Sequence, residues 1–471
     1  MRWGLVCVAL VGCADVDVRS AVHGKFVDRL YTPRGVVEQP ADMSTRAFRV
    51  YSNGRWYPES GLVSGAEDGT LYIDVPEGPY LLDTVHADGS MSWDQREDHN
   101  FIDVAVRTGR ADAQPATSVP MQVLLTNLAP WGEGNNELLV DCYENGTEHY
   151  PFELATSLTA GATELRGTFD WASTYSGPLA WLNKYQTRYL IDANAGDMLT
   201  VSRNSTVSNA NLIVSRLTQI ARGPVNTQRD GEASSFTGTF SDVTPTASQR
   251  FTIDMPAIAA QLPEVDGWVV GLKKSPSSVA FDTFGPSLLA VTVDAVQTAP
   301  VTFTESYGDP FDADWQIVAT GTYVARLDPP ALPDGRRAYF PWSAYATEQR
   351  HLELGADFTL APTQAFVTSA SIDGHALVGD LPWDGESPLS FHVDVPAGEA
   401  GFIADVLWVP AGEIYPELWT TLRSQAADVV LPADALQLGL DYFVRVAVTN
   451  ETETSRSAAY KLLGPFRLVR Y

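Results

Sequence analysis

Apolar and polar residues alternate along most of the chain in short runs, a pattern typical of half-buried β-strands. The runs are rich in Thr, Val, Tyr and Phe, and they end at Gly, Pro, Asn or Asp. These turn residues recur about every 8–12 positions, which is the spacing of all-β sandwiches. We therefore predict an all-β protein built from several tandem β-sandwich domains. Clear strand candidates are residues 69–75, 121–125, 287–293 and 443–448.

Helical periodicity is scarce. We expect at most one or two helical turns at residues 256–262 and at residues 415–419. Strands are expected to stop at the Pro of three similar phrases, residues 72–76, 251–256 and 391–396, because Pro cannot donate to a strand ladder. The similarity of these three segments has two explanations: they share the residue pattern common to many strands, or they belong to related sandwich domains.

Residues 436–448 carry the most specific fold signal. Leu436 precedes Tyr442 by six residues with a Gly between them, and alternating Val and Arg residues follow. This pattern resembles the corner between strands E and F of a fibronectin type III domain, a relative of the immunoglobulin-like sandwiches. The resemblance covers residues 366–471 and implies that the Tyr442 hydroxyl bonds to upstream backbone. It also implies strands at 389–393, 402–408 and 429–431, although the first lacks the family's usual Trp.

Residues 23–28 and 68–80 resemble a carboxypeptidase-regulatory or prealbumin-like sandwich, an accessory module that brings no catalytic group. Phrases between residues 128 and 199 are similar to uncharacterised surface lipoproteins of Gram-negative bacteria. The chain length predicts several domains. We place them at 21–110, 111–235, 236–365 and 366–471.

The first residues form a candidate export signal. Residues 1–12 have a positive start at Arg2 and an apolar stretch too short to span a bilayer. Residues 10–13 resemble the lipobox of bacterial lipoproteins, which implies cleavage before Cys13, lipidation of that cysteine and a tether at residues 13–20. The alternative is a buried strand that ends in a free cysteine. Ala14, where an inner-membrane retention signal would have Asp, implies the outer membrane, on its periplasmic or cell-surface side.

Charge and cysteine content narrow the function. The 471 residues carry a net charge of −27, and loss of residues 1–12 removes only Arg2. Such a chain repels nucleic acid, so we expect no nucleic-acid partner. Once Cys7 leaves and Cys13 is lipidated, Cys142 remains alone and no internal disulfide can form. We expect Cys142 to be a buried strand residue rather than a reactive thiol.

Catalytic motifs for hydrolases, metalloproteases and nucleotide-binding enzymes are missing from the sequence, so we expect a protein that is not an enzyme. His99 lies in the charged run 94–100, which we interpret as a solvated loop. An acidic turn resembles a set of calcium ligands but lacks the Gly and the distal Glu of an EF-hand, and an ordinary turn is the simpler interpretation. No other cofactor is expected. The candidate calcium ligands are Asp309, Asp312 and Asp314.

Aromatic clusters are the best lead to a ligand. Exposed aromatic side chains stack on sugars or anchor protein interfaces, whereas buried ones only pack sandwich cores. The candidate binding residues are Trp171, Tyr175, Trp181, Tyr185, Trp342 and Tyr345.

Together these features predict a lipid-anchored envelope or surface protein that acts in binding, adhesion or structural support. Its partners are then the membrane, through the anchor, and a glycan or a protein. One alternative is a carbohydrate-binding or carbohydrate-active surface enzyme with its site in residues 111–365. The other is a lipoprotein subunit of an envelope assembly or secretion complex.

Overall fold

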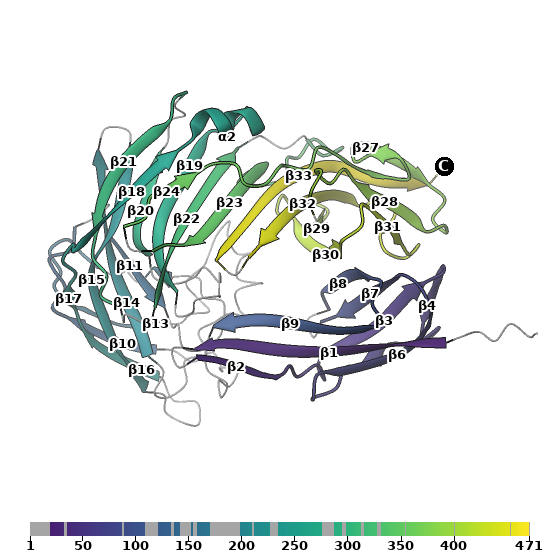
Figure 1. The fold of residues 1–471 in the computed structure, drawn as a ribbon, viewed down its shortest axis with the longest axis horizontal. Helices are drawn as coiled ribbons and strands as arrows, with labels where there is room; N and C mark the ends of the chain where they lie inside the picture. The colour runs from purple at the N-terminus through teal and green to yellow at the C-terminus, as the bar shows by residue number, and fades with distance from the viewer. Residues whose placement is uncertain are drawn as a thin grey trace, which may run out of the picture.

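The computed structural model is all-β with sandwich-type sheets, as predicted (Figure 1). Among the described residues, α2 (Met255–Gln261) is the only α-helix; it begins where the Asp254 side chain accepts a hydrogen bond from the Ala257 backbone N–H at 3.2 Å. The structure describes residues 19–32, 35–86, 89–108, 121–132, 136–141, 152–153, 158–169, 198–209, 212–226, 234–275, 287–293, 298–311, 315–326, 331–353, 355–399, 401–452 and 454–470.

The first sandwich packs two sheets around the buried rings of Phe26, Phe48 and Tyr80. One sheet contains β1, β2, β6 and β9, and the other contains β3, β4, β5, β7 and β8. Alternate residues of β6 are buried, as its period-two sequence predicts. The strands are β1 (Arg19–Thr32), β2 (Gly35–Pro40), β3 (Ala47–Ser52), β4 (Arg55–Tyr57), β5 (Val63–Ser64), β6 (Thr70–Pro76), β7 (Tyr80–Val85), β8 (Met91–Arg96) and β9 (Asn100–Thr108).

The second sandwich surrounds a core that includes Leu125, Trp131 and Phe236. The buried Arg203 side chain donates hydrogen bonds to the backbone carbonyls of Ala129 at 2.6 Å and Pro130 at 3.2 Å. These bonds fix the connection after β10. The strands are β10 (Met121–Thr126), β11 (Asn136–Asp141), β12 (Phe152–Glu153), β13 (Leu165–Phe169), β14 (Met198–Asn209), β15 (Leu212–Asn226), β16 (Ser234–Thr239) and β17 (Ser241–Asp242).

The third sandwich has the largest core, which includes Phe251, Trp268 and Tyr323. Helix α2 adds Met255 and Ile258 to this core. The strands are β18 (Ala247–Ile253), β19 (Gly267–Ser275), β20 (Ser287–Val293), β21 (Val301–Tyr307), β22 (Gln316–Ala325), β23 (Ala344–His351) and β24 (Phe358–Leu360).

The last sandwich contains the strands that the fibronectin type III resemblance implies. The expectation of helical turns at residues 415–419 is wrong: β30 covers most of them. Trp419 and the two Thr residues after it favour a strand, and the Thr residues and Leu418 pair with β29. The strands are β25 (Ala370–Ile372), β26 (His375–Ala376), β27 (Gly379–Trp383), β28 (Leu389–Val393), β29 (Phe402–Val409), β30 (Glu417–Ser424), β31 (Asp428–Leu431), β32 (Asp441–Glu451) and β33 (Ser455–Arg470).

One continuous sheet passes through all four sandwiches. Main-chain pairing crosses the predicted boundary between residues 365 and 366, because β33 pairs with β23 of the third sandwich as well as with β32. The hydrogen-bonded order along the sheet is β12-β11-β14-β15-β20-β19-β22-β23-β33-β32-β29-β30-β8-β7-β3.

The sandwiches lie on both faces of this sheet. Neighbouring residues of a strand point to opposite faces. Leu81 belongs to the core of the last sandwich and Leu82 to that of the first. Likewise, Ile220 belongs to the third core and Ala221 to the second. The outer layers of neighbouring sandwiches can therefore cover opposite faces of one sheet.

The third and last sandwiches cover the same face. Val448 of β32 lies directly opposite Ala459 of β33, and these residues belong to the last and third cores. The first and second sandwiches therefore cover the other face, near its two ends. We call this second face the inner face; in Figure 1 the first sandwich lies below the last one and the second sandwich lies at the left.

A seam between β8 and β30 joins the first sandwich to the last. The two strands run parallel, with Met91 to Asp94 opposite Thr420 to Arg423. Trp93 is 1% exposed and packs in the core of the last sandwich. Its indole Nε1 donates to the Asp83 carboxylate at 3.0 Å. The interpretation of residues 94–100 as a loop is therefore wrong for its first three residues, which belong to β8, and for Asn100, which begins β9.

The tyrosine corner is present in the last sandwich. The Tyr442 side chain is fully buried, and its hydroxyl accepts a hydrogen bond from the Gln437 backbone N–H at 2.9 Å. This confirms the bond that the sequence predicts. We expect Tyr442→Phe to lower the free energy of unfolding by about 1–2 kcal/mol, because the Gln437 backbone N–H loses its acceptor. Urea denaturation measures this change, and an unaltered unfolding midpoint would argue against the corner bond.

A histidine on the outer sheet of the last sandwich predicts a pH effect. His392 contacts Asp428 at 2.8 Å and Asp394 at 3.2 Å. The hydrogen bonds with Asp428 and then Asp394 raise the pKa of His392. The stabilisation from the protonated ring is thus complete below the unfolded pKa and is lost as the pH rises through the higher folded pKa. We expect melting temperatures from pH 5.5 to 8.5 to fall less in His392→Gln than in the wild type; parallel curves would oppose this prediction.

Candidate functional site

Two of the six predicted ligand-binding aromatics lie in the described structure, and they lie together. Trp342 is 36% exposed, and its ring meets the Tyr345 ring edge-on at 5.0 Å between centroids. The remaining predicted residues, together with Cys142, lie outside the described residues. These are Cys13, Trp171, Tyr175, Trp181, Tyr185, Asp312 and Asp314.

A stacked tyrosine pair joins the third sandwich to the last on the inner face. Tyr345 of β23 lies directly opposite Tyr460 of β33. Their rings are 4.3 Å apart and nearly parallel, with an interplanar angle of 11°. Both side chains are half-buried. The two tyrosine rings cover one face of each other, and Trp342 packs edge-on against Tyr345. The three rings thus form a partly exposed aromatic cluster, a feature that stacks on sugar rings or on apolar side chains.

An ion pair continues this row across the last sandwich. The Arg445 guanidinium of β32 donates two hydrogen bonds to Asp405 Oδ2 of β29, from Nε at 3.1 Å and from Nη2 at 2.5 Å. The Thr421 hydroxyl of β30 donates to the other oxygen of Asp405 at 2.8 Å. We call Tyr345, Tyr460, Arg445, Asp405 and Thr421 the inner-face row.

The ionisable groups of the inner-face row shift each other's pKa values. Burial raises the pKa of the Tyr345 hydroxyl, and the nearby Arg445 charge opposes that rise. Burial also lowers the pKa of Arg445, but Asp405 and Tyr345 more than offset this effect, so the pKa of Arg445 lies above its ordinary value. Tyr345 is therefore neutral and Arg445 charged at neutral pH. Both oxygens of Asp405 accept hydrogen bonds, which hold the Arg445 guanidinium in place. The row therefore presents two aromatic rings and a guanidinium in fixed positions.

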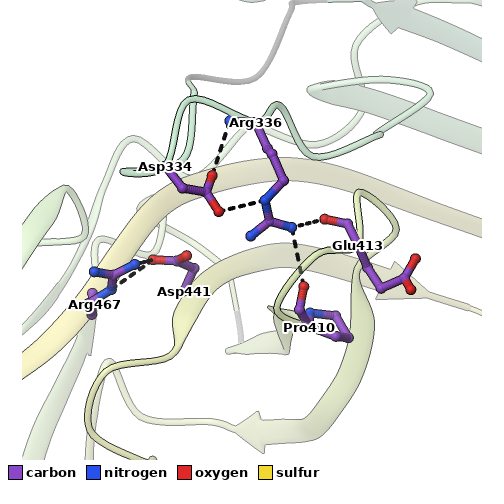
Figure 2. A network of polar contacts seen from close by, with 6 residues as sticks. All are labelled: Asp334, Arg336, Pro410, Glu413, Asp441 and Arg467. Atoms are coloured by element: carbon purple, nitrogen blue, oxygen red, sulfur yellow. Dashed lines mark hydrogen bonds and ion pairs between the residues drawn. The ribbon is translucent and has the colours of Figure 1, made fainter.

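A covering segment, residues 331–343, closes one end of the inner face. The Arg336 guanidinium donates to Asp334 Oδ2 at 2.5 Å, to the Pro410 carbonyl at 3.2 Å and to the Glu413 carbonyl (Figure 2). Figure 2 also shows the neighbouring pair in which Arg467 donates to Asp441. The bonds from Arg336 to Pro410 and Glu413 attach a connection of the third sandwich to the last one.

The covering segment also buries apolar surface. Phe340 meets Phe443 of β32 edge-on at 4.9 Å, and Leu332 packs in the same small core. Tyr339 remains 46% exposed beside the Tyr415 ring. The aromatic residues of the covering segment thus comprise a packing residue, Phe340, and two exposed rings, Tyr339 and Trp342.

The predicted calcium turn contains an ion pair at its first residue. The Lys274 ammonium, which is only 3% exposed, donates to Asp309 Oδ2 at 2.8 Å and to the Trp315 carbonyl at 2.7 Å. Asp309 Oδ1 accepts from the Phe311 backbone N–H at 3.1 Å. A calcium ion at this carboxylate would compete with the ammonium. In the described ranges, no three His, Cys, Asp or Glu side chains gather to hold a metal ion.

Sequence reasoning missed Tyr460, Arg445 and Asp405. A signal for Arg445 was present, because the alternation in residues 443–448 places it on the face opposite Val444 and Val446. The pairing of β23 with β33 could not be foreseen, since these strands are far apart in sequence.

Comparisons with known proteins assign this chain to no family. No protein-family model and no curated protein matches the chain. Among solved structures, the chain is weakly similar to "Crystal structure of tetra-tandem repeat in extending region of large adhesion protein", with 11% identity and a TM-score of 0.10 over 93% of this chain and 99% of that one. This TM-score is far below that of proteins sharing a fold. In the described residues, no helix is long and apolar enough to cross a membrane.

Proposed function

We propose that this chain is a lipid-anchored, non-enzymatic envelope or surface protein that binds a glycan or a protein partner through its inner face. The observation that carries the proposal is the continuous sheet. Main-chain hydrogen bonds link all four sandwiches, so the chain forms one platform rather than a flexible string of modules. A platform of this kind holds the inner-face row in a fixed position, which lowers the entropic cost of binding.

The start of the fold supports a close tether. Arg19 begins β1, so only five residues separate it from Cys13. Such a link spans about 20 Å at full extension. Lipidation of Cys13 would therefore keep the first sandwich near the membrane surface, and two or more acyl chains anchor a protein stably.

The anchor is tested by expressing the wild type and Cys13→Ala and separating membrane from soluble fractions. We expect the wild type in the membrane fraction and the variant in the soluble fraction. Protease treatment of intact cells then determines which side of the outer membrane the protein faces. A Cys13→Ala protein that stays in the membrane fraction would refute lipid anchoring.

Binding is tested with purified residues 19–471 on a glycan array and on immobilised envelope proteins. Tyr345→Ala and Trp342→Ala each remove part of the aromatic surface, and we expect signals to fall by about tenfold. Tyr72→Ala, which removes an exposed ring on the first sandwich, is the control. Equal signals from all variants would exclude the inner-face row as the binding surface, and hydrolysis of a bound glycan would contradict a non-enzymatic role.

A further inference from the structure

A cavity lies where the seam between the first and last sandwiches opens. It has a volume of about 650 Å³, in the range of small-ligand pockets. Its walls come from the end of β8 with the residues that follow, and from the end of β30 with the residues that follow. Phe402 and Ile403 of β29 add apolar surface.

The cavity begins where main-chain pairing ends. The last paired residues are Asp94 and Arg423, although β8 continues to Arg96 and β30 continues to Ser424. Beyond that pair the strands are linked by a side-chain bond, in which the Ser424 hydroxyl donates to Gln95 Oε1 at 2.5 Å. Gln95 and Arg96 of β8 pair with β7, and Ser424 of β30 pairs with β29, but on the cavity side none of the three has a strand partner among the described residues. Such free edges are surfaces to which an extended peptide adds.

The basic and acidic residues that line the cavity differ in whether they have a partner of opposite charge. The Arg96 guanidinium is already paired with Asp103 at 3.1 Å and lies 4.0 Å from the centre of the Phe101 ring. Arg423 faces Asp94 at 3.8 Å. Among the described residues, both of these arginines thus have a carboxylate partner, whereas other carboxylates at the entrance have no salt-bridge partner.

Two of the entrance carboxylates belong to Glu97 and Asp98. Both residues are exposed, and within the described part of the chain neither forms a salt bridge. The Asp98 backbone carbonyl accepts a hydrogen bond from the buried Tyr80 hydroxyl at 2.7 Å, so the turn that carries both carboxylates is fixed. The local field therefore favours a cationic group, as does the chain's net charge of −27.

We infer that this cavity, the seam cavity, binds an extended peptide segment that carries a Lys or Arg side chain. The basic side chain lies against Glu97 and Asp98, while the peptide backbone lies along the free edges of β8 and β30. This inference goes beyond the proposed function: it concerns a different surface from the inner-face row and does not depend on lipid anchoring.

The test is calorimetric titration of purified residues 19–471 with two blocked pentapeptides, Val-Lys-Val-Lys-Val and Val-Glu-Val-Glu-Val. We expect the basic peptide to bind and the acidic peptide not to bind. The double variant Glu97→Gln with Asp98→Asn should weaken binding by about tenfold. Glu353→Gln removes an exposed carboxylate of the third sandwich and should leave binding unchanged.

A second variant tests the cavity without changing charge. Ala426 is exposed on the cavity wall, so Ala426→Trp fills the space at no cost to a core. We expect it to abolish binding of the basic peptide. The inference is overturned if the wild type does not bind, if Ala426→Trp binds as the wild type does, or if Glu353→Gln weakens binding as much as the double variant, since the last result means diffuse attraction to an acidic surface.

Discussion

Replacing Trp93 with Ala is expected to lower the free energy of unfolding by about 3–5 kcal/mol, the range for truncation of a buried Trp. The indole is 1% exposed, packs in the core of the last sandwich and donates to Asp83 at 3.0 Å. Its loss leaves a cavity at the seam and removes a donor from a buried carboxylate. Urea denaturation followed by circular dichroism measures the change.

The same variant is expected to separate the first sandwich from the others. Trp93 belongs to the first sandwich but packs in the core of the last one. Its loss therefore weakens the attachment of the first sandwich to the last, as well as the packing of that core. Limited proteolysis of Trp93→Ala should therefore release the first sandwich at protease levels that leave the wild type intact. Trp342→Ala, which removes a partly exposed ring far from the seam in sequence, serves as the control. Similar losses in both variants would argue against a special role for the seam.

Asp309→Asn is expected to destabilise the protein by about 3 kcal/mol, because it leaves the buried Lys274 ammonium without its counter-charge. Lys274 is 3% exposed, and Asp309 is its carboxylate partner at 2.8 Å. The substitution keeps the size of the side chain, so packing changes little. Thermal and urea unfolding at neutral pH measure the loss.

The effect of calcium on the melting temperature distinguishes a stabilising ion pair at Asp309 from a calcium site. If the ion pair is the stabilising contact, the melting temperature of the wild type is the same in EDTA and in millimolar CaCl₂. The double variant Lys274→Met with Asp309→Leu should recover much of the lost stability, since an apolar pair can replace a buried ion pair. A melting temperature that rises with calcium in the wild type but not in Asp309→Asn would instead support a calcium site.

Local patterns predicted local structure well. The strand at Ser287–Val293 was expected with its observed bounds, and β10 and β32 contain two other expected runs. For the expected run 69–75, β6 begins one residue later, at Thr70, and ends at Pro76. Of the three Pro phrases, one ends its strand as expected, since β6 stops at Pro76, whereas β18 and β28 stop three residues before the Pro, at Ile253 and Val393. The bond of Tyr442 to upstream backbone followed from a short motif whose residues are close in sequence.

The arrangement of the sandwiches could not be predicted in the same way. The pairing of β8 with β30 joins residues 91–94 to residues 420–423, and no local pattern specifies a contact of that sequence separation. Residues 94–96 were interpreted as loop because charged residues are usually solvated, whereas here Asp94 and Arg96 lie at a junction that partly covers them. The inner-face row could not be predicted for the same reason: its members come from five strands, and only the pairing of those strands brings them together.

Hydrogen–deuterium exchange on residues 19–471 tests the central claim, that one continuous sheet joins the first sandwich to the last. Main-chain hydrogen bonds in a sheet interior slow amide exchange, whereas strand edges exchange quickly. We predict that peptides covering β8 and β30 exchange as slowly as those covering β29, and that Trp93→Ala speeds exchange in both. Rapid exchange of β8 and β30 in the wild type, at the rate of edge strands such as β31, would contradict the account.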